Sequence, residues 1–307
     1  MDAPGPSNVF EVAQADVGRR LDAFLAERLG LSRAQTRRLL GRGVVKVDGR
    51  PLGEGAKGVA LRAGERVEVG EEADADTVAP EPDLPFPVLA RGDGWIVADK
   101  PAGMPVHPLT PDERGTLLNA AVARHPEMQG VGDEGGLRSG VVHRLDVDTS
   151  GALLLATQPR SWTRLRGAFR EHRVAKTYRA IALGNVRDHG EVELQLVTAR
   201  HRPAFVRAAR DDERGRKTIT RWRVLERLRG ATLLEVETVT GFLHQVRATL
   251  AHLGHPLAGD ATYAEKDPTG ASRHMLHAAS LRFEEIEAKC ADPKDFTALF
   301  VALGGAG

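Results

Sequence analysis

The 307-residue sequence contains one cysteine, Cys290, and only two tyrosines. A single thiol excludes an intrachain disulfide framework and a cysteine-based zinc finger, and it is typical of a reducing compartment. No apolar run reaches the 18 or more residues that a membrane span needs, and the first residues lack the apolar segment of a signal peptide. We therefore expect a cytoplasmic protein that makes no contact with a membrane.

The sequence also lacks a surplus of charge, since 43 Lys and Arg face 42 Asp and Glu. Binding to nucleic acid would therefore have to come from local clusters of basic residues. The chain has neither a phosphate-binding loop nor a dinucleotide-binding fingerprint, so we expect no cofactor. The pairs His252 with His255 and His274 with His277 have no nearby cysteine and no inward carboxylate, so we expect no metal.

Hydrophobic periodicity predicts an α+β fold. Apolar residues at helical spacing indicate helices over residues 115–124 and 159–171, and alternating patterns indicate strands near residues 174–183, 192–197, 218–225 and 233–239. Strands in quick succession favour a mixed, largely antiparallel sheet over a doubly wound one. We expect a small domain over residues 8–70, an acidic, proline-rich spacer over 71–87, a catalytic domain over 88–290 and a tail over 291–307.

The small N-terminal domain is locally basic, with ten Lys or Arg against five acids between residues 16 and 58. Leu21, Leu25 and Leu29 predict one helix, and Ser32 with Gln35 predicts a capping box that starts a second. Such a charge run is usually only a solvated surface. The candidates for RNA binding on the second helix and the following hairpin are Arg33, Arg37, Arg38, Arg42 and Lys46.

Residues 143–151 concentrate the ionisable side chains of the larger domain. His143, Arg144, Asp146 and Asp148 lie within six residues between two short apolar stretches. An aspartate in such a loop most often caps backbone amides in a structural turn. In an extended loop, however, Arg144 and Asp146 would lie on the same side, so that the guanidinium favours the charged carboxylate.

This segment reads His-Arg-Leu-Asp-Val-Asp-Thr-Ser-Gly, and it resembles the central motif of the RluA-type pseudouridine synthases at all seven fixed positions. The resemblance implies that Asp146 is the catalytic residue. It extends to Lys176-Thr-Tyr178, whose tyrosine would pack against the target base, and to residues 240–247, where Arg247 would pair with the catalytic aspartate. Phe242 departs from the family, which has arginine there. The N-terminal domain resembles the RNA-binding domain of ribosomal small-subunit protein four.

Further candidates for substrate contact accompany these motifs. They are His143, Arg144, Lys176, His244 and Gln245. Lys100 and His107 lie in another segment that resembles the family, and they are candidates either for RNA contact or for support of the catalytic loop. An arginine in the first turn of a helix opposes the helix dipole, so Arg247 is expected to have an acidic partner.

The resemblance implies an RNA pseudouridine synthase, which detaches a uracil from its sugar and rejoins it through carbon five. Asp146 would act as nucleophile at the sugar or as base on the neighbouring carbon, and Tyr178 is a candidate to assist proton removal from carbon five. We expect a monomer that acts on ribosomal RNA in preference to transfer RNA. The alternatives are a non-catalytic RNA-binding or assembly protein on the same scaffold, and a hydrolase that uses Asp146 and Asp148 as a carboxylate pair.

Overall fold

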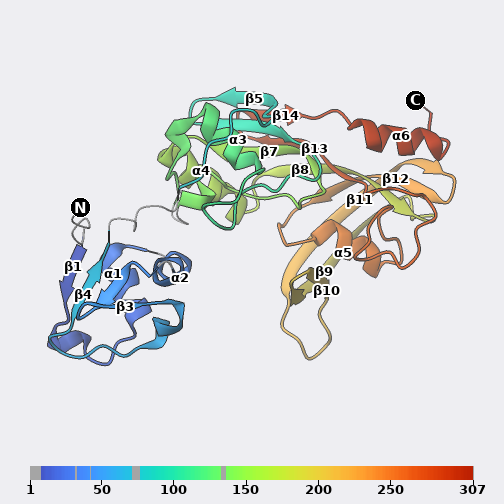
Figure 1. The fold of residues 1–307 in the computed structure, drawn as a ribbon. Coiled ribbons are helices and arrows are strands. Elements are labelled where there is room, and N and C mark those ends of the chain that lie inside the picture. The colour runs from blue at the N-terminus through green and yellow to red at the C-terminus, as the bar shows by residue number, and fades with distance from the viewer. Residues whose placement is uncertain (1–7, 32, 42, 71–76, 133–135, 307) are drawn as a thin grey trace. The chain divides into compact units, whose positions relative to one another are not determined.

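A computed structural model describes residues 8–31, 33–41, 43–70, 77–132 and 136–306 (Figure 1). The chain forms two compact units. The smaller unit holds residues 1–79 with the short segments 108–113 and 129–139, and the larger unit holds the remainder. In the described part of the chain, no helix has the length and apolar character to cross a membrane.

The smaller unit is a four-stranded antiparallel sheet with two helices. Its strands lie in the order β1-β4-β2-β3. Leu21 and Leu25 of α1 are fully buried and Leu29 partly so, which confirms the predicted apolar face. Asp48 and Gly49 both have positive φ, as a tight hairpin turn between β2 and β3 requires. The elements are β1 (Asn8–Glu11), α1 (Leu21–Leu29), α2 (Arg33–Gly41), β2 (Val45–Val47), β3 (Arg50–Leu52) and β4 (Arg66–Val69).

The predicted start of α2 cannot be compared with the structure. Ser32 lies outside the described residues, and so do the side chain of Gln35 and the proposed capping box. Among the RNA-binding candidates, Arg42 lies outside them too, as do the side chains of Arg33 and Arg38. Arg37 and Lys46 are described, and both are exposed.

The larger unit is built on one ten-stranded sheet, in the order β10-β9-β11-β12-β8-β13-β7-β6-β5, with β14 paired to β13. Among the described strands, β13 and β7 pair in parallel and the other neighbours are antiparallel. The prediction of a mixed, largely antiparallel α+β fold is therefore confirmed. The strands are β5 (Val88–Gly92), β6 (Trp95–Lys100), β7 (Ser150–Ala156), β8 (Ala175–Leu183), β9 (His189–His201), β10 (Ala204–Ala208), β11 (Arg216–Leu228), β12 (Ala231–Thr238), β13 (Leu276–Phe283) and β14 (Ile286–Lys289).

Helices cover both faces of this sheet (Figure 1). Ala180 and Ala182 of β8 pack with α5, whereas Ile181, between them, packs with α6 on the opposite face. The side chains of α6 in that cluster are Phe296 and Phe300. The helices of the larger unit are α3 (Leu117–Arg124), α4 (Pro159–Arg170), α5 (Gln245–His252) and α6 (Lys294–Ala302). The last helix lies in the segment that we expected to be a tail.

The acidic segment before β5 differs from the expected spacer. From Pro80 onward it belongs to the larger unit, and Glu81 accepts a hydrogen bond from the backbone N–H of Gly115 at 2.6 Å. Arg124 of α3 donates to the carbonyls of Pro82 and Leu84. Residues 80–87 are therefore packed along α3, because their carbonyls and carboxylates satisfy donors of that helix.

Candidate active site

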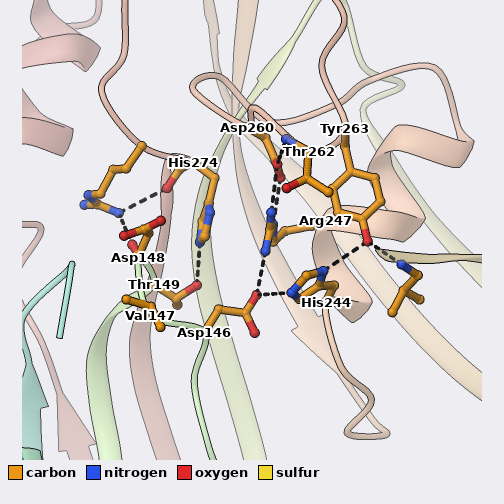
Figure 2. Close-up of polar contacts among 12 residues, drawn as sticks. Asp146, Val147, Asp148, Thr149, His244, Arg247, Asp260, Thr262, Tyr263 and His274 are labelled. Atoms are coloured by element: carbon orange, nitrogen blue, oxygen red, sulfur yellow. Dashed lines mark hydrogen bonds and ion pairs between the residues drawn. The ribbon is translucent and has the colours of Figure 1, made fainter. Parts of the chain in front are cut away.

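Asp146 lies in the loop that leads into β7. Leu145 points into the core, whereas Arg144 is exposed and the side chain of Asp146 is 18% exposed, as the predicted alternation requires. The guanidinium that Asp146 meets is not that of Arg144, however. It belongs to Arg247, whose Nη1 donates to Asp146 Oδ2 at 3.1 Å across 101 residues of sequence (Figure 2). The expected local pairing is therefore replaced by a long-range one.

Arg247 lies in the first turn of α5 and is buried between two carboxylates. Its Nε and Nη2 donate to Asp260 at 2.7 and 2.8 Å, while Nη1 reaches Asp146 (Figure 2). Burial lowers the pKa of Arg247, but the two carboxylates, with Asp260 foremost, raise it above its ordinary value. The acidic partner expected for an arginine at this end of a helix is thus present twice.

Asp260 was missed by sequence reasoning. Its carboxylate is fully buried, and it also accepts a hydrogen bond from the backbone N–H of Thr262 at 3.1 Å. Gly259 before it has a positive φ of 76°, and a Cβ there would lie 1.8 Å from the carbonyl oxygen of Arg273, so only glycine fits. The available signal was the glycine and aspartate pair in a turn that resembles the family.

His244 lies on the other side of Asp146. It is the residue before α5, with a left-handed φ of 52°, and its Nε2 is 3.8 Å from Asp146 Oδ2. The hydroxyl of Tyr263 is 3.1 Å from His244 Nδ1, and it accepts a hydrogen bond from Val206 of β10. Burial lowers the pKa of His244, and Asp146 opposes this shift. A neutral ring that accepts from Tyr263 at Nδ1 carries its hydrogen on Nε2, directed at Asp146.

Tyr178 on β8 shares this neighbourhood. Burial raises its pKa to about 12, the side chain of Thr238 partly offsets the shift, and the negative charge of Asp146 adds to it. The phenol is therefore protonated at neutral pH. Its ring packs beside Val236 and Leu276, at the edge of an apolar cluster. The structure thus brings the side chains of Asp146 and Arg247 into contact, and the hydroxyl of Tyr178 lies where the charge of Asp146 affects it.

Lys100 supports the loop that carries Asp146 through hydrogen bonds to backbone carbonyls. This side chain is fully buried, and its Nζ donates to the carbonyls of Pro101, Met104 and Val147 at 2.7 to 2.8 Å. Burial lowers the pKa of Lys100 to about 7, against the opposing charges of Asp148 and Asp146. Of the two roles considered for Lys100, the structure supports the loop and excludes RNA contact, because a fully buried ammonium cannot reach a phosphate.

The other predicted substrate contacts divide into two groups. His143 accepts a hydrogen bond from the backbone N–H of Leu154 and stacks on Phe169, with 4.4 Å between ring centroids. The amide of Gln245 is 4% exposed, and it bonds Thr240 and Phe242 through oxygen and Ile219 and Thr220 through nitrogen. These two side chains support the fold, and their contact with the substrate stays a prediction.

Lys176 and Arg144 remain nearer to solvent. Lys176 Nζ donates to the carbonyl of Thr240 at 3.0 Å, and burial lowers its pKa to about 8. Phe242, where the family has arginine, packs in an apolar cluster with Leu196 and Val206.

The chain is similar to a known protein family and to several known proteins. The family model described as RNA pseudouridylate synthase matches residues 94–252. The chain is 36% identical to "Ribosomal large subunit pseudouridine synthase D" of Xanthomonas campestris pv. campestris, over 95% of this chain and 91% of that protein. It is 32% identical to the protein of the same name from Haemophilus ducreyi, over 95% and 93%.

Solved structures with a similar fold include two human proteins. "Human RNA Pseudouridylate Synthase Domain Containing 1" matches with a TM-score of 0.58 and 25% identity, over 71% of this chain and 90% of that one. "Human RNA Pseudouridylate Synthase Domain Containing 4" matches with a TM-score of 0.57 and 22% identity, over 71% and 92%.

Proposed function

We propose that this chain, which belongs to the RNA pseudouridylate synthase family and is an RNA pseudouridine synthase, modifies uridines of ribosomal RNA with Asp146 as its catalytic residue. The observation that carries the proposal is the ion pair between Asp146 and Arg247, at 3.1 Å. A buried guanidinium, already oriented by Asp260, presents one nitrogen to a carboxylate that solvent still reaches. That arrangement fixes the carboxylate in place without closing access to it.

The reaction makes two demands that the site fulfils. The target nucleotide has to leave its stack, which costs a few kcal/mol. The ring of Tyr178 offers the extruded uracil a stacking surface, worth about 1 to 3 kcal/mol. Asp146 then attacks the sugar or removes a proton from its neighbouring carbon, and both routes use the carboxylate form, which is the form that pairs with Arg247.

The release of the proton from carbon five is the last step. Because its pKa is raised to about 12, Tyr178 does not act as a ready phenolate. Its hydroxyl takes part only as a relay, which accepts the proton from carbon five while it passes its own proton to water.

Ribosomal RNA as substrate is supported by two features. The relatives compared above carry ribosomal large subunit in their names. The smaller unit presents exposed cations on α2 and on the hairpin of β2 and β3, namely Arg37, Lys46 and Arg50. Arg19, Arg20 and Arg28 are instead paired with acids of the same unit. We therefore assign backbone contacts to α2 and the hairpin, which would add affinity but no chemistry.

The test is pseudouridine formation in a large-subunit ribosomal RNA transcript, detected by carbodiimide labelling and primer extension. Asp146→Asn is expected to abolish the product while RNA affinity is kept. Asp148→Asn is the matched control, since its side chain is exposed on the same loop, and it is expected to stay active. Release of free uracil by the wild type without pseudouridine, lost in both variants, would favour the carboxylate-pair hydrolase.

Two further outcomes concern the substrate. Arg37→Glu with Lys46→Glu is expected to weaken binding of ribosomal RNA and to flatten its salt dependence. Wild-type protein that binds this RNA but forms no pseudouridine would favour the non-catalytic RNA-binding alternative. Modification of transfer RNA alone would refute the choice of ribosomal RNA.

A further inference from the structure

The far end of the catalytic loop is held by a second buried arginine. Arg273, just before β13, is 8% exposed, and its Nη1 donates to the carbonyl of Asp148 at 2.9 Å. The same nitrogen bonds the carbonyl of His274 at 3.1 Å. Asp148 is two residues from Asp146, so this guanidinium fixes the loop close to the reacting carboxylate.

The residues after Arg273 continue the contact. His274 Nε2 is 2.8 Å from the hydroxyl of Thr149, and His277 Nδ1 is 2.9 Å from that of Ser150. The N–H of Thr149 donates to the carbonyl of Asp146 at 3.1 Å, which closes the turn. Asp148, Thr149 and Ser150 are thus each bonded to the segment that begins at Arg273, and Figure 2 shows the first two of these contacts.

The other edge of the same guanidinium faces the C-terminal helix. Nε and Nη2 of Arg273 donate to the two oxygens of Asp295 in the first turn of α6, at 2.6 and 3.1 Å. The pairing with Arg273 lowers the pKa of Asp295. The helix is itself fixed, because Phe296 and Phe300 pack beneath the sheet. A continuous set of contacts therefore runs from α6 through Arg273 to the loop of Asp146.

We propose that Asp295 is a positioning residue for catalysis. Acting through Arg273, it holds the catalytic loop in the position at which the carboxylate of Asp146 accepts a hydrogen bond from Arg247. A planar guanidinium is suited to this task, since one edge binds a carboxylate by two points while the remaining nitrogen binds carbonyls. The inference rests on the proposed role of Asp146, because it explains how that residue is placed.

The chain supplies a matched control. Arg179 of β8 and Asp292 form another ion pair, at 3.1 Å, that joins the segment before α6 to the sheet. This pair makes one contact where Arg273 and Asp295 make two, and its arginine reaches no carbonyl of the catalytic loop among the described contacts. Loss of this second pair removes an anchor of the C-terminal segment without a direct effect on the loop.

The experiment measures single-turnover pseudouridine formation at saturating enzyme, RNA affinity by filter binding and the thermal midpoint of each variant. Asp295→Asn is expected to slow the single-turnover step about tenfold to a hundredfold, as small displacements of a reacting group do. RNA affinity should stay within about twofold, because the pair belongs to the larger unit and the RNA-binding cations belong to the smaller one. Asp292→Asn is expected to keep the wild-type rate.

Arg273→Lys gives a second reading should Asp295→Asn fail to fold. Lysine keeps the charge, but one ammonium cannot span both Asp295 and the carbonyl of Asp148, so the same slowing is expected. The double variant Arg273→Lys with Asp295→Asn should be no slower than Arg273→Lys alone, since both act on one contact.

A wild-type rate in folded Asp295→Asn or Arg273→Lys overturns the inference. Equal slowing in Asp295→Asn and Asp292→Asn also overturns it, because the effect would then come from the C-terminal segment in general. The proposed function is judged separately by Asp146→Asn, whose inactivity would stand in either case.

Discussion

Asp260→Asn offers the most direct test of how the site is held together. The substitution keeps the shape of the side chain but removes its charge from a fully buried position, where it makes two hydrogen bonds to Arg247. The amide would also turn an N–H toward one of the guanidinium N–H groups. Removal of one partner of a buried ion pair costs about 3 to 5 kcal/mol, and the isosteric change places the expected loss near the lower value.

Urea unfolding followed by circular dichroism measures this loss. With an m-value of about 3 kcal/mol per M for a unit of this size, the midpoint is expected to fall by about 1 M. Pseudouridine formation should fall as well, because Arg247 would lose the contact that orients it toward Asp146. Both effects come from one contact, so they should appear together.

Glu213→Gln is the control for burial. Glu213 pairs with Arg207 through two hydrogen bonds of 2.6 and 2.7 Å, but the two side chains are 34% and 29% exposed. The same chemical change there is expected to shift the midpoint far less, because water solvates both partners. A loss for Asp260→Asn no larger than that for Glu213→Gln would refute the argument that burial makes the first pair costly to break.

Three more outcomes follow from the site. Lys100→Met should cost about 3 kcal/mol in urea unfolding and should slow turnover, because three buried carbonyls lose their donor; unchanged stability would contradict that role. Tyr178→Phe should keep RNA affinity and slow turnover about a hundredfold, whereas Tyr178→Ala should weaken both in the same assays. His274→Gln should remove a pH dependence of the free energy of unfolding. Burial lowers the pKa of His274 from 6.5 to about 4, so the native state stays neutral while the unfolded state takes up a proton. The wild type should therefore lose about 3 kcal/mol relative to His274→Gln as the pH falls from 6.5 to 4, and parallel curves would contradict this.

Local pattern was sufficient for much of the fold, whereas the catalytic loop was predicted from its resemblance to the family. Helix α4 begins at Pro159, and α3 carries the apolar positions that its periodicity predicted. These features depend on neighbours three or four residues away, which a sequence displays directly. Asp146 and Tyr178 were singled out because the short motifs that contain them resemble those of the family.

The supporting residues could not be found in this way. Asp260 follows a turn and has no periodic pattern, and its function depends on the direction in which Arg247 points. The role of Lys100 depends on three carbonyls that converge only in the folded chain. Helix α6 was taken for a tail because the resemblance fades there, although Phe296 and Phe300, four residues apart, carried a helical signal.

The difference between the two carboxylates on Arg247 indicates which oxygen of Asp146 would react in the role proposed for it. Asp260 is fully buried and uses both oxygens on Arg247 and Thr262, so desolvation and its hydrogen bonds leave it nothing to offer a substrate. Asp146 is 18% exposed, and its described contacts with Arg247 and His244 both end on Oδ2. Oδ1 is therefore the oxygen that can approach the sugar carbon or its neighbouring proton. Arg247 makes two hydrogen bonds to Asp260 and one to Asp146, so Asp146 keeps one oxygen that Arg247 does not bind.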